Sequence, residues 1–208
     1  MSRARVAVAV KRAVDVVGAA TLLVVTAPVL ALAALAVRVT MGSPVLFRQE
    51  RIGQDERRFV VVKLRTMRAP APGEGGPASD GARLTRLGRW LRACGVDELP
   101  QLCGVVRGDL SLVGPRPLLP AYLPRYSDEQ RRRHEVPPGL TGLAQVYGRN
   151  AVTWGERLAL DVWYVDHWSL ALDARIALRT VDVLRRRVGA SAEGHATMPE
   201  FRGTESAS

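Results

Sequence analysis

The chain has 208 residues, of which 47% are hydrophobic, and it carries a formal charge of +10. This length suits one medium domain, or a small domain with an anchor, and is too short for a multidomain assembly. The charge indicates a polyanionic partner, such as nucleic acid, anionic lipid or a phosphorylated substrate, and two cysteines are too few for a disulfide framework or a four-cysteine metal site.

An uncharged run from Val16 to Val37 concentrates apolar residues near the N-terminus. As a helix it extends roughly 33 Å at 1.5 Å per residue, which is about the thickness of a bilayer core. The run is too long for the apolar part of a signal peptide, which spans about 7–15 residues. It therefore predicts a membrane helix, with a signal peptide as the less favoured alternative.

A proline and the flanking charges bear on how this helix meets the membrane. Pro28 removes a backbone donor and frees the carbonyl of Val24, so it predicts a bend, where the Thr26 hydroxyl is placed to satisfy the loosened backbone. Because Lys and Arg collect on the cytoplasmic side, basic residues at both ends favour a re-entrant helix over a straight span, which stays open as an alternative. These residues are Arg3, Arg5, Lys11 and Arg12 before the run, and Arg38, Arg48, Arg51, Arg57 and Arg58 after it.

The next segment, residues 44–66, predicts a β-hairpin of two short apolar strands around a polar turn at Gly53. Residues 69–81 are rich in Pro, Gly and Ala without periodicity, so they predict a loop. Residues 84–94 place apolar side chains at helical spacing with arginines on the other face, and Gly95 is suited to end that helix.

A second helix start follows at Asp97, because Asp before Glu with a proline soon after is typical of a helix N-terminus. Gly104 or Gly108 would close this helix, and residues 109–117 then predict a short strand that runs into a rigid turn. The remaining predicted elements are a surface helix at 126–135, a turn–strand–turn at 137–150, a helix opened by the capping box of Thr153 and Glu156 and running to about Tyr164, a last helix at 172–187, and a disordered tail at 189–208.

The adjacent carboxylates of Asp97 and Glu98 are the most informative feature. At a helix start the dipole stabilises an anionic side chain and also a bound phosphate. The plain alternative is that Asp97 only caps the helix. Two arginines favour a phosphate site: Arg92 lies one helix end earlier, and Arg116 is held in the stiff Gly-Pro-Arg-Pro sequence at 114–117.

Weaker candidates for phosphate contacts lie on either side of this pair. Lys63 and Arg65 are predicted on one face of a strand, where a lysine also serves to discourage edge pairing. Arg149 follows a predicted strand within Gly-Arg-Asn, which is also an ordinary turn sequence. Asp161 lies among aromatic residues that fit either packing or a membrane-interface belt, namely Trp163, Tyr164 and Trp168.

Several catalytic motifs are absent from the sequence. It has no Gly-x-x-x-x-Gly-Lys-Ser/Thr loop, no Gly-x-Ser-x-Gly elbow and no His/Cys metal spacing. These absences disfavour P-loop kinases, serine hydrolases and zinc enzymes. A membrane-attached, arginine-rich chain with one carboxylate pair instead points to phosphate chemistry, with Mg²⁺ bridging a carboxylate and phosphate oxygens.

A series of short motifs follows one another in a specific order along residues 11–183. They are Lys11-Arg12-x-x-Asp15, PVLFRQ at 44–49 with RIG at 51–53, KLRTM at 63–67, RLTRLG at 83–88, DELPQ at 97–101, SLVGPRP at 111–117, PGLTG at 138–142 and DVWY at 161–164. With these motifs the chain resembles the minimal form of the bacterial sugar transferase family, the monotopic phosphoglycosyl transferases that load a sugar phosphate onto a polyprenyl phosphate. It departs from the family's usual residues at 95–96, 103–104 and 110.

The resemblance implies a re-entrant membrane helix, a Mg²⁺-dependent site and ping-pong chemistry with a UDP-sugar and undecaprenyl phosphate. Asp97 matches the family's nucleophile, which attacks the β-phosphate, forms a phosphoglycosyl aspartate and releases UMP; it is also the expected Mg²⁺ ligand. Glu98 matches the neighbouring carboxylate, expected to assist acceptor deprotonation or metal binding. The residues expected to contact substrate are Lys63, Arg65, Arg92, Arg116, Arg149 and Asp161.

We therefore expect a helix-rich α/β (α+β) enzyme with three parts, which would initiate a surface glycan. These are a Pro-broken re-entrant membrane helix at 1–40, a catalytic domain at 41–188 on the cytoplasmic face of a bacterial plasma membrane, and a disordered tail at 189–208. Anionic membrane lipids are expected partners, nucleic acid is not, and a homo-oligomer stays open. The alternative is a membrane-tethered basic protein that binds anionic lipid or nucleic acid without catalysis.

Overall fold

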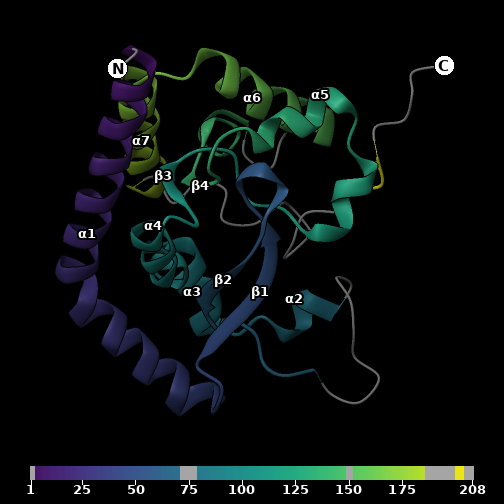
Figure 1. The fold of residues 1–208 in the computed structure, drawn as a ribbon. Coiled ribbons are helices and arrows are strands. Elements are labelled where there is room, and N and C mark those ends of the chain that lie inside the picture. The colour runs from purple at the N-terminus through teal and green to yellow at the C-terminus, as the bar shows by residue number, and fades with distance from the viewer. Residues whose placement is uncertain (1–2, 71–78, 149–151, 186–199, 204–208) are drawn as a thin grey trace.

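The computed structural model describes residues 3–70, 79–148, 152–185 and 200–203. One long helix runs along one side of a body of shorter helices and two small sheets, which confirms the expected helix-rich α/β class (Figure 1). The described elements are α1 (Arg3–Met41), β1 (Leu46–Ile52), η1 (Gln54–Glu56), β2 (Arg58–Leu64), α2 (Asp80–Arg83), α3 (Arg86–Ala93), η3 (Val96–Gln101), α4 (Leu102–Arg107), β3 (Ser111–Val113), η4 (Pro120–Arg125), α5 (Asp128–Arg131), η5 (Arg132–His134), β4 (Gly139–Thr141), η6 (Ala144–Gly148), α6 (Trp154–His167) and α7 (Leu170–Arg185).

The apolar helix predicted at the N-terminus is α1, and it contains Pro28. Figure 1 shows that α1 changes direction part-way along, as expected for a helix with an internal proline. The Thr26 hydroxyl donates to the carbonyl of Leu22 at 2.6 Å rather than to the carbonyl of Val24, which Pro28 frees. By length and composition, the segment Arg5–Met41 is sufficient to cross a membrane.

Most apolar side chains of α1 face away from the body of the protein. Val24, Leu32 and Val39 are 75%, 68% and 77% exposed, whereas Ala19 and Val37 on the inner face are fully buried. Exposure of apolar surface to water costs about 25 cal/mol per Å², so an outer face of this kind marks an interaction site. Contact with lipid fits its length and composition.

Polar contacts of Lys11 and Asp15 attach the N-terminal part of α1 to the rest of the protein. The Lys11 ammonium donates to Asp173 Oδ2 at 2.6 Å and to the carbonyl of Val113 at 3.1 Å. Asp15 is 5% exposed and accepts a hydrogen bond from Ser111 Oγ at 2.8 Å. The chain is therefore fixed to β3 and α7 immediately before the uncharged run begins.

Arg65 ties the other end of α1 to the same body. Its guanidinium donates to the carbonyls of Met41, of Gly42 at 2.8 Å and of Ser43 at 3.2 Å. Carbonyls at a helix end lack intrahelical partners, so Arg65 satisfies groups that α1 itself leaves open. Both ends of the apolar run are thus bonded to one body.

The predicted hairpin is confirmed by the antiparallel pairing of β1 with β2. The register runs from Leu46 opposite Leu64 to Ile52 opposite Arg58. Ile52, Val61 and Leu64 are only 2–3% exposed, and they anchor the hairpin on the body.

The helix predicted at 84–94 is α3, which begins two residues later. Thr85 Oγ1 caps it by accepting a hydrogen bond from the Gly88 amide at 2.9 Å. Gly95 then adopts the left-handed conformation, with φ 69°, and the chain turns directly into η3. The following pair η3 and α4 ends at Gly108, one of the two predicted stops.

The two short strands β3 and β4 form a parallel pair. Ser111 lies opposite Gly139, and Val113 lies opposite Thr141. This pairing places the loop after β3 against the chain around β4. Helix α6 then opens with the predicted capping box of Thr153.

The segment predicted as a surface helix at 126–135 has a buried end. It forms α5 and η5, and Arg133 and His134 are only 2% and 5% exposed. Arg133 is buried because it pairs with Asp161, and His134 Nδ1 lies 3.2 Å from the carbonyl of Gly53. A buried ion pair leaves no periodic signal in the sequence, because its partner is distant along the chain.

The expectation of a disordered tail is wrong for residues 200–203, while the rest of the tail lies outside the described residues. Phe201 is fully buried, and the Arg125 guanidinium donates to its carbonyl. A single apolar residue in a polar segment gives no periodicity by which to predict this docking. The aromatic partners of Phe201 are Tyr122, Tyr126 and Trp154.

Candidate active site

The candidate site is built at the turn that joins α3 to η3. The left-handed Gly95 reverses the chain, and its carbonyl accepts a hydrogen bond from the Glu98 amide at 3.2 Å. Asp97 and Glu98 therefore stand in the first turn of η3, as the sequence predicts.

Glu98 is the centre of a charged cluster. Its Oε1 accepts hydrogen bonds from the Lys63 ammonium at 2.5 Å and from Arg116 Nη2 at 2.7 Å. Burial by itself would raise the pKa of the Glu98 carboxyl, but the charges and hydrogen bonds of Arg116 and Lys63 outweigh burial and hold this pKa well below its usual range. Burial also lowers the pKa of Lys63, although the charge of Glu98 opposes that shift. Glu98 is thus an ionised group that binds two cations.

Asp97 differs from Glu98 in having no direct partner. Among the described residues, no hydrogen bond or salt bridge reaches its carboxylate, although the residue is only 6% exposed. Burial raises the pKa of Asp97 and the negative charge of Glu98 adds to the rise, while Lys63 and nearby arginines oppose it. A buried carboxylate with a perturbed pKa and no partner is typical of a reactive group.

Arg92 approaches the pair from the last turn of α3. Its Nε donates to Thr66 Oγ1 at 3.0 Å, and Thr66 is only 6% exposed. Gly88 permits this packing, because a Cβ at that position would lie 1.9 Å from the Thr66 carbonyl oxygen. The charge of Arg92 lowers the pKa of Asp97, which places it among the cations of the site.

The loop that follows β3 carries Arg116. The Gly114 amide donates to the carbonyl of Thr141 at 2.9 Å, and the Gly139 amide donates to the carbonyl of Pro115 at 2.8 Å. The two segments approach so closely that a Cβ on Gly139 would lie 2.1 Å from the nitrogen of Gly114. Backbone contacts therefore fix the stiff loop that the sequence predicts.

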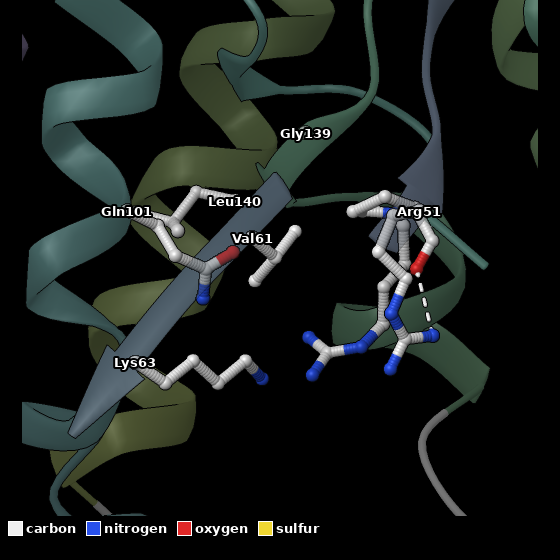
Figure 2. Close-up of a pocket in the computed structure, with 8 residues that line it drawn as sticks. Arg51, Val61, Lys63, Gln101, Gly139 and Leu140 are labelled. Atoms are coloured by element: carbon white, nitrogen blue, oxygen red, sulfur yellow. Dashed lines mark hydrogen bonds between the residues drawn. The ribbon is translucent and has the colours of Figure 1, made fainter. Parts of the chain in front are cut away.

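A small cavity lies beside the cations that bind Glu98, and neither carboxylate of the pair is among its lining residues. Figure 2 shows the side chains of Arg51, Lys63 and Gln101 directed toward it from β1, β2 and η3. Lys63 and Arg116, which bind Glu98, belong to its wall, and together with Arg51 they suit it to an anion such as phosphate. The cavity is lined by Arg51, Val61, Lys63, Gln101, Arg116, Pro117, Gly139 and Leu140.

Arg51 joins the site although no motif assigned it a role there. Burial, followed by the charge of Arg116, lowers the pKa of Arg51 to about 10, and its Nη1 donates to the carbonyl of Pro117 at 3.4 Å. The pairing of the two predicted hairpin strands could have revealed that Arg51 lies on the same face as Lys63. Arg51 stands opposite Phe59, which shares a face of β2 with Lys63, so pairing puts both cations on one side.

Two predicted substrate-binding residues lie elsewhere, and a third is not described. Arg65 follows the end of β2, so its guanidinium reaches the end of α1 instead of sharing a face with Lys63. Asp161 in α6 is 2% exposed and binds Arg133 at 2.7 and 3.1 Å, away from the cavity lining. Arg149 lies outside the described residues.

The aromatic cluster near Asp161 is mostly packing. Tyr164 is 1% exposed and its hydroxyl donates to Asp173 Oδ1 at 2.7 Å, while Trp168 Nε1 donates to Asp173 Oδ2 at 3.1 Å. Trp163 alone among the three remains 44% exposed, stacked on His167 with ring centroids 4.2 Å apart. An interfacial role is therefore restricted to Trp163.

The donor set fits a metal ion only if substrate completes the site. Among the described residues there is no group of three or more His, Cys, Asp or Glu side chains that could hold a metal. Mg²⁺, however, is commonly bound by one or two carboxylates together with substrate phosphates. The unpartnered carboxylate of Asp97 fits that arrangement.

Comparison with known proteins identifies the family of this chain. A model of the family described as bacterial sugar transferase matches residues 6–187. The chain belongs to the bacterial sugar transferase family. The family resemblance expected from the motifs is thereby confirmed.

Similar proteins connect this sugar transferase to named activities. It is 46% identical over 194 residues to the uncharacterized sugar transferase EpsL of Bacillus subtilis, covering 93% of this chain and 96% of the relative. It is 47% identical over 184 residues to UDP-glucose:undecaprenyl-phosphate glucose-1-phosphate transferase of Caulobacter vibrioides, covering 84% and 69%. It is 36% identical over 199 residues to undecaprenyl-phosphate galactose phosphotransferase of Salmonella typhimurium, covering 86% and 41%.

Proposed function

We propose that this sugar transferase moves a sugar 1-phosphate from a UDP-sugar to undecaprenyl phosphate and releases UMP. Relatives matched over 84% and 86% of the chain are named as glucose 1-phosphate and galactose phosphotransferases with undecaprenyl phosphate. A small cavity lined by three cationic side chains, two of which bind Glu98, suits the phosphates of such a donor. Since the named sugars of the relatives differ, the proposal names the donor class and not its sugar.

The observation that carries the proposal is the unequal surroundings of two adjacent carboxylates. Glu98 is bonded directly to Lys63 and Arg116, whereas Asp97 is buried beside it without a direct partner among the described residues. A carboxylate that no hydrogen-bonded cation neutralises keeps an electron pair available for attack on phosphorus. We therefore assign Asp97 as the nucleophile and Glu98 as the group that holds the two cations.

The proposed transfer has two steps at one phosphorus atom. A carboxylate oxygen of Asp97 attacks the β-phosphorus, the bond to the bridging oxygen breaks, and UMP leaves with the electron pair, so that a phosphoglycosyl aspartate remains. An oxygen of undecaprenyl phosphate then attacks the same phosphorus, Asp97 leaves as a carboxylate, and the product is the undecaprenyl diphosphate sugar. Lys63, Arg92 and Arg116 offset negative charge on the transferred group.

The low pKa of Glu98 bears on its role in the second step. A carboxylate that remains ionised far below neutral pH is a weak base, and a phosphate monoester with a second pKa of about 6 is already mostly ionised at neutral pH. This favours holding cations or metal over deprotonating the acceptor. Asp97, with Glu98 beside it, would hold Mg²⁺ through carboxylate oxygens. When bound, Mg²⁺ supplies positive charge at the diphosphate.

The membrane arrangement that we propose is a re-entrant α1 with the catalytic domain, residues 41–188, on the cytoplasmic face. The support is that Lys11 and Asp15 before the apolar run, and the Arg65 contacts after it, all bond to one body. One body on one side of a bilayer requires both helix ends on that side, and the basic flanks assign that side to the cytoplasm. These flanks then lie against anionic lipid headgroups.

The proposed reaction is tested by UMP release from the full chain in nanodiscs, with Mg²⁺, undecaprenyl phosphate and a panel of UDP-sugars. We expect release with a specific donor and none from Asp97→Asn, while membrane association is unchanged.

The pKa of Asp97 is higher in the folded than in the unfolded chain, so its ionised form destabilises the fold at neutral pH. Asp97→Asn should therefore raise the melting temperature, by about 2–4 °C for each kcal/mol relieved.

Asp55→Asn is the matched control for this substitution. Asp55 is exposed and has φ 52°, a left-handed conformation that Asn tolerates well, so activity and stability should both stay near wild type. UMP release retained by Asp97→Asn would exclude the covalent step. Absence of release with every donor, together with tight binding to anionic vesicles, would favour the membrane-tethered binding protein instead.

A further inference from the structure

Arg133 and Asp161 form the most deeply buried salt bridge among the described residues. Their side chains are 2% and 3% exposed, and Arg133 Nε and Nη2 donate to Asp161 Oδ2 at 3.1 and 2.7 Å. Neither residue lines the cavity. Burying two charges is expensive, and replacing such a pair by apolar residues of similar volume is often neutral or stabilising. Stability is therefore a weak explanation for this pair.

Arg133 also binds the loop that carries Arg116. Its Nη2 donates to the carbonyl of Arg116 at 2.7 Å. Since Nη2 carries two hydrogens, it can serve the Asp161 carboxylate and this carbonyl at the same time. Asp161 in α6 is thus connected to the backbone of Arg116 by two successive hydrogen bonds through one guanidinium.

The loop at 114–117 depends on donors from outside it. Pro115 and Pro117 have no N–H, so the loop has few hydrogen bonds of its own with which to fix its conformation. Each carbonyl of residues 115–117 instead accepts a hydrogen bond from another part of the chain. These bonds are Gly139 amide to Pro115 at 2.8 Å, Arg133 to Arg116 at 2.7 Å and Arg51 to Pro117 at 3.4 Å.

We propose that Asp161 and Arg133 are positioning residues that hold Arg116 in the orientation in which it meets the donor diphosphate. Asp161 fixes the plane of the Arg133 guanidinium, and Arg133 fixes the carbonyl of the residue whose own side chain reaches Glu98 at 2.7 Å. A displacement of about 1 Å at such a group can lower a rate roughly a hundredfold. The inference rests on the proposed function, because it needs Arg116 to contact phosphate.

A purely structural role is the competing explanation. Removal of one partner leaves the other charge buried and unpaired, which destabilises any fold. Such destabilisation does not depend on whether the guanidinium of Arg116 is present. A positioning effect, by contrast, acts only through that guanidinium, so a double-mutant cycle separates the two explanations.

The experiment measures the dissociation constant of UDP in the presence of Mg²⁺ for the full chain in nanodiscs. Asp161→Asn, Arg116→Ala and the double variant are compared with the wild type. We expect Asp161→Asn to weaken UDP binding roughly tenfold or more when Arg116 is present, and by no more than about twofold in the Arg116→Ala background. The kcat/KM for UMP release should follow the same pattern.

Asp166→Asn is the matched control, because Asp166 pairs with Arg132 across the same two elements, α6 and η5, at the surface. It is expected to leave UDP affinity unchanged.

Arg133→Lys supplies a second test if Asp161→Asn does not fold. Lysine keeps the charge beside Asp161 but lacks the planar fork that serves two acceptors, so UDP binding should again weaken only when Arg116 is present.

The outcomes separate this inference from the function on which it rests. Equal losses of UDP affinity with and without Arg116, or no loss at all, would overturn the positioning role while leaving the proposed function intact. Failure of the wild type to bind UDP would contradict both. UMP release by Asp97→Asn would contradict only the covalent step.

Discussion

At the scale of single residues, two adjacent carboxylates acquire opposite properties from their contacts. Glu98 touches Lys63 and Arg116, which hold its pKa low, whereas Asp97 senses the same cations only at a distance and keeps a raised pKa because burial dominates. Both residues lie in the first turn of η3, after the left-handed Gly95, where neighbouring side chains point in different directions. This difference is what supports the proposed roles, Asp97 as the nucleophile and Glu98 as the group that holds the cations.

The acid limb of the pH profile should report on Asp97. If Asp97 is the nucleophile, it must be ionised, and its pKa is raised, so UMP release should fall with decreasing pH sooner than an ordinary aspartate with a pKa of about 3.9 would predict. The charge of Lys63 lowers the pKa of Asp97, so Lys63→Met should move this limb to still higher pH and also lower the rate. The measurement is kcat/KM for UMP release as a function of pH.

Lys63→Arg keeps the positive charge and serves as the control for this shift. Its acid limb should stay close to that of the wild type, even if the different shape of the guanidinium lowers the rate. An acid limb that does not move in Lys63→Met would contradict the assignment of Asp97 as the group that titrates.

Sequence patterns predicted the placement of residues that depends on their own segment, but not the placement that depends on a distant partner. Asp97, Glu98 and Arg116 were predicted because a helix start and a proline-stiffened turn are local features. Arg65 was expected beside Lys63, but β2 ends one residue earlier and the side chain turns to α1. Asp161 was expected to contact substrate from the family resemblance, and its buried partner Arg133 could not be predicted because it is distant along the chain.

At the scale of elements, α1 was predicted in position and type but not in its attachments. The uncharged run predicted the helix, and Pro28 predicted its change of direction. The contacts of Lys11 with Asp173 and of Arg65 with the helix end join residues far apart in sequence, so spacing alone could not reveal them. These attachments are what favour a re-entrant path over a straight span.

Labelling of engineered cysteines tests that path in the native membrane. Arg5→Cys and Ser43→Cys, each placed in a variant that lacks Cys94 and Cys103, should react with a membrane-impermeant maleimide from the cytoplasmic side only. The physical reason is that both ends of the apolar run are bonded to one body. Labelling of the two positions from opposite sides would contradict the re-entrant arrangement.

Replacement of Pro28 tests whether the proline causes the proposed re-entrant path of α1. Pro28→Ala restores a backbone donor and removes the ring clash, so a straight span should become favoured even though it breaks the contacts that hold one helix end to the body. Positions 5 and 43 should then be labelled from opposite sides. Labelling that stays on one side in Pro28→Ala would show that the polar attachments, and not the proline, determine the path.

At the scale of the whole molecule, the C-terminal segment completes a core that begins next to the active-site loop. Leu118, directly after the loop that carries Arg116, packs in one cluster with Tyr122, Leu158 and Phe201. This contact could not be predicted, because the residues around Phe201 show no sustained apolar periodicity. Long-range closure of this kind depends on the assembled surface and not on local propensity.

Phe201→Ala should therefore destabilise the whole fold and not only its last residues. Phe201 is fully buried, and a Phe→Ala change at such a site costs about 3–5 kcal/mol. Phe47→Ala is the control, because Phe47 is 45% exposed and should change stability little. Thermal melting in nanodiscs measures the difference, and truncation after residue 199 should lower the melting temperature as Phe201→Ala does. Equal melting of Phe201→Ala and the wild type would mean that the segment docks without stabilising the cluster beside the active-site loop.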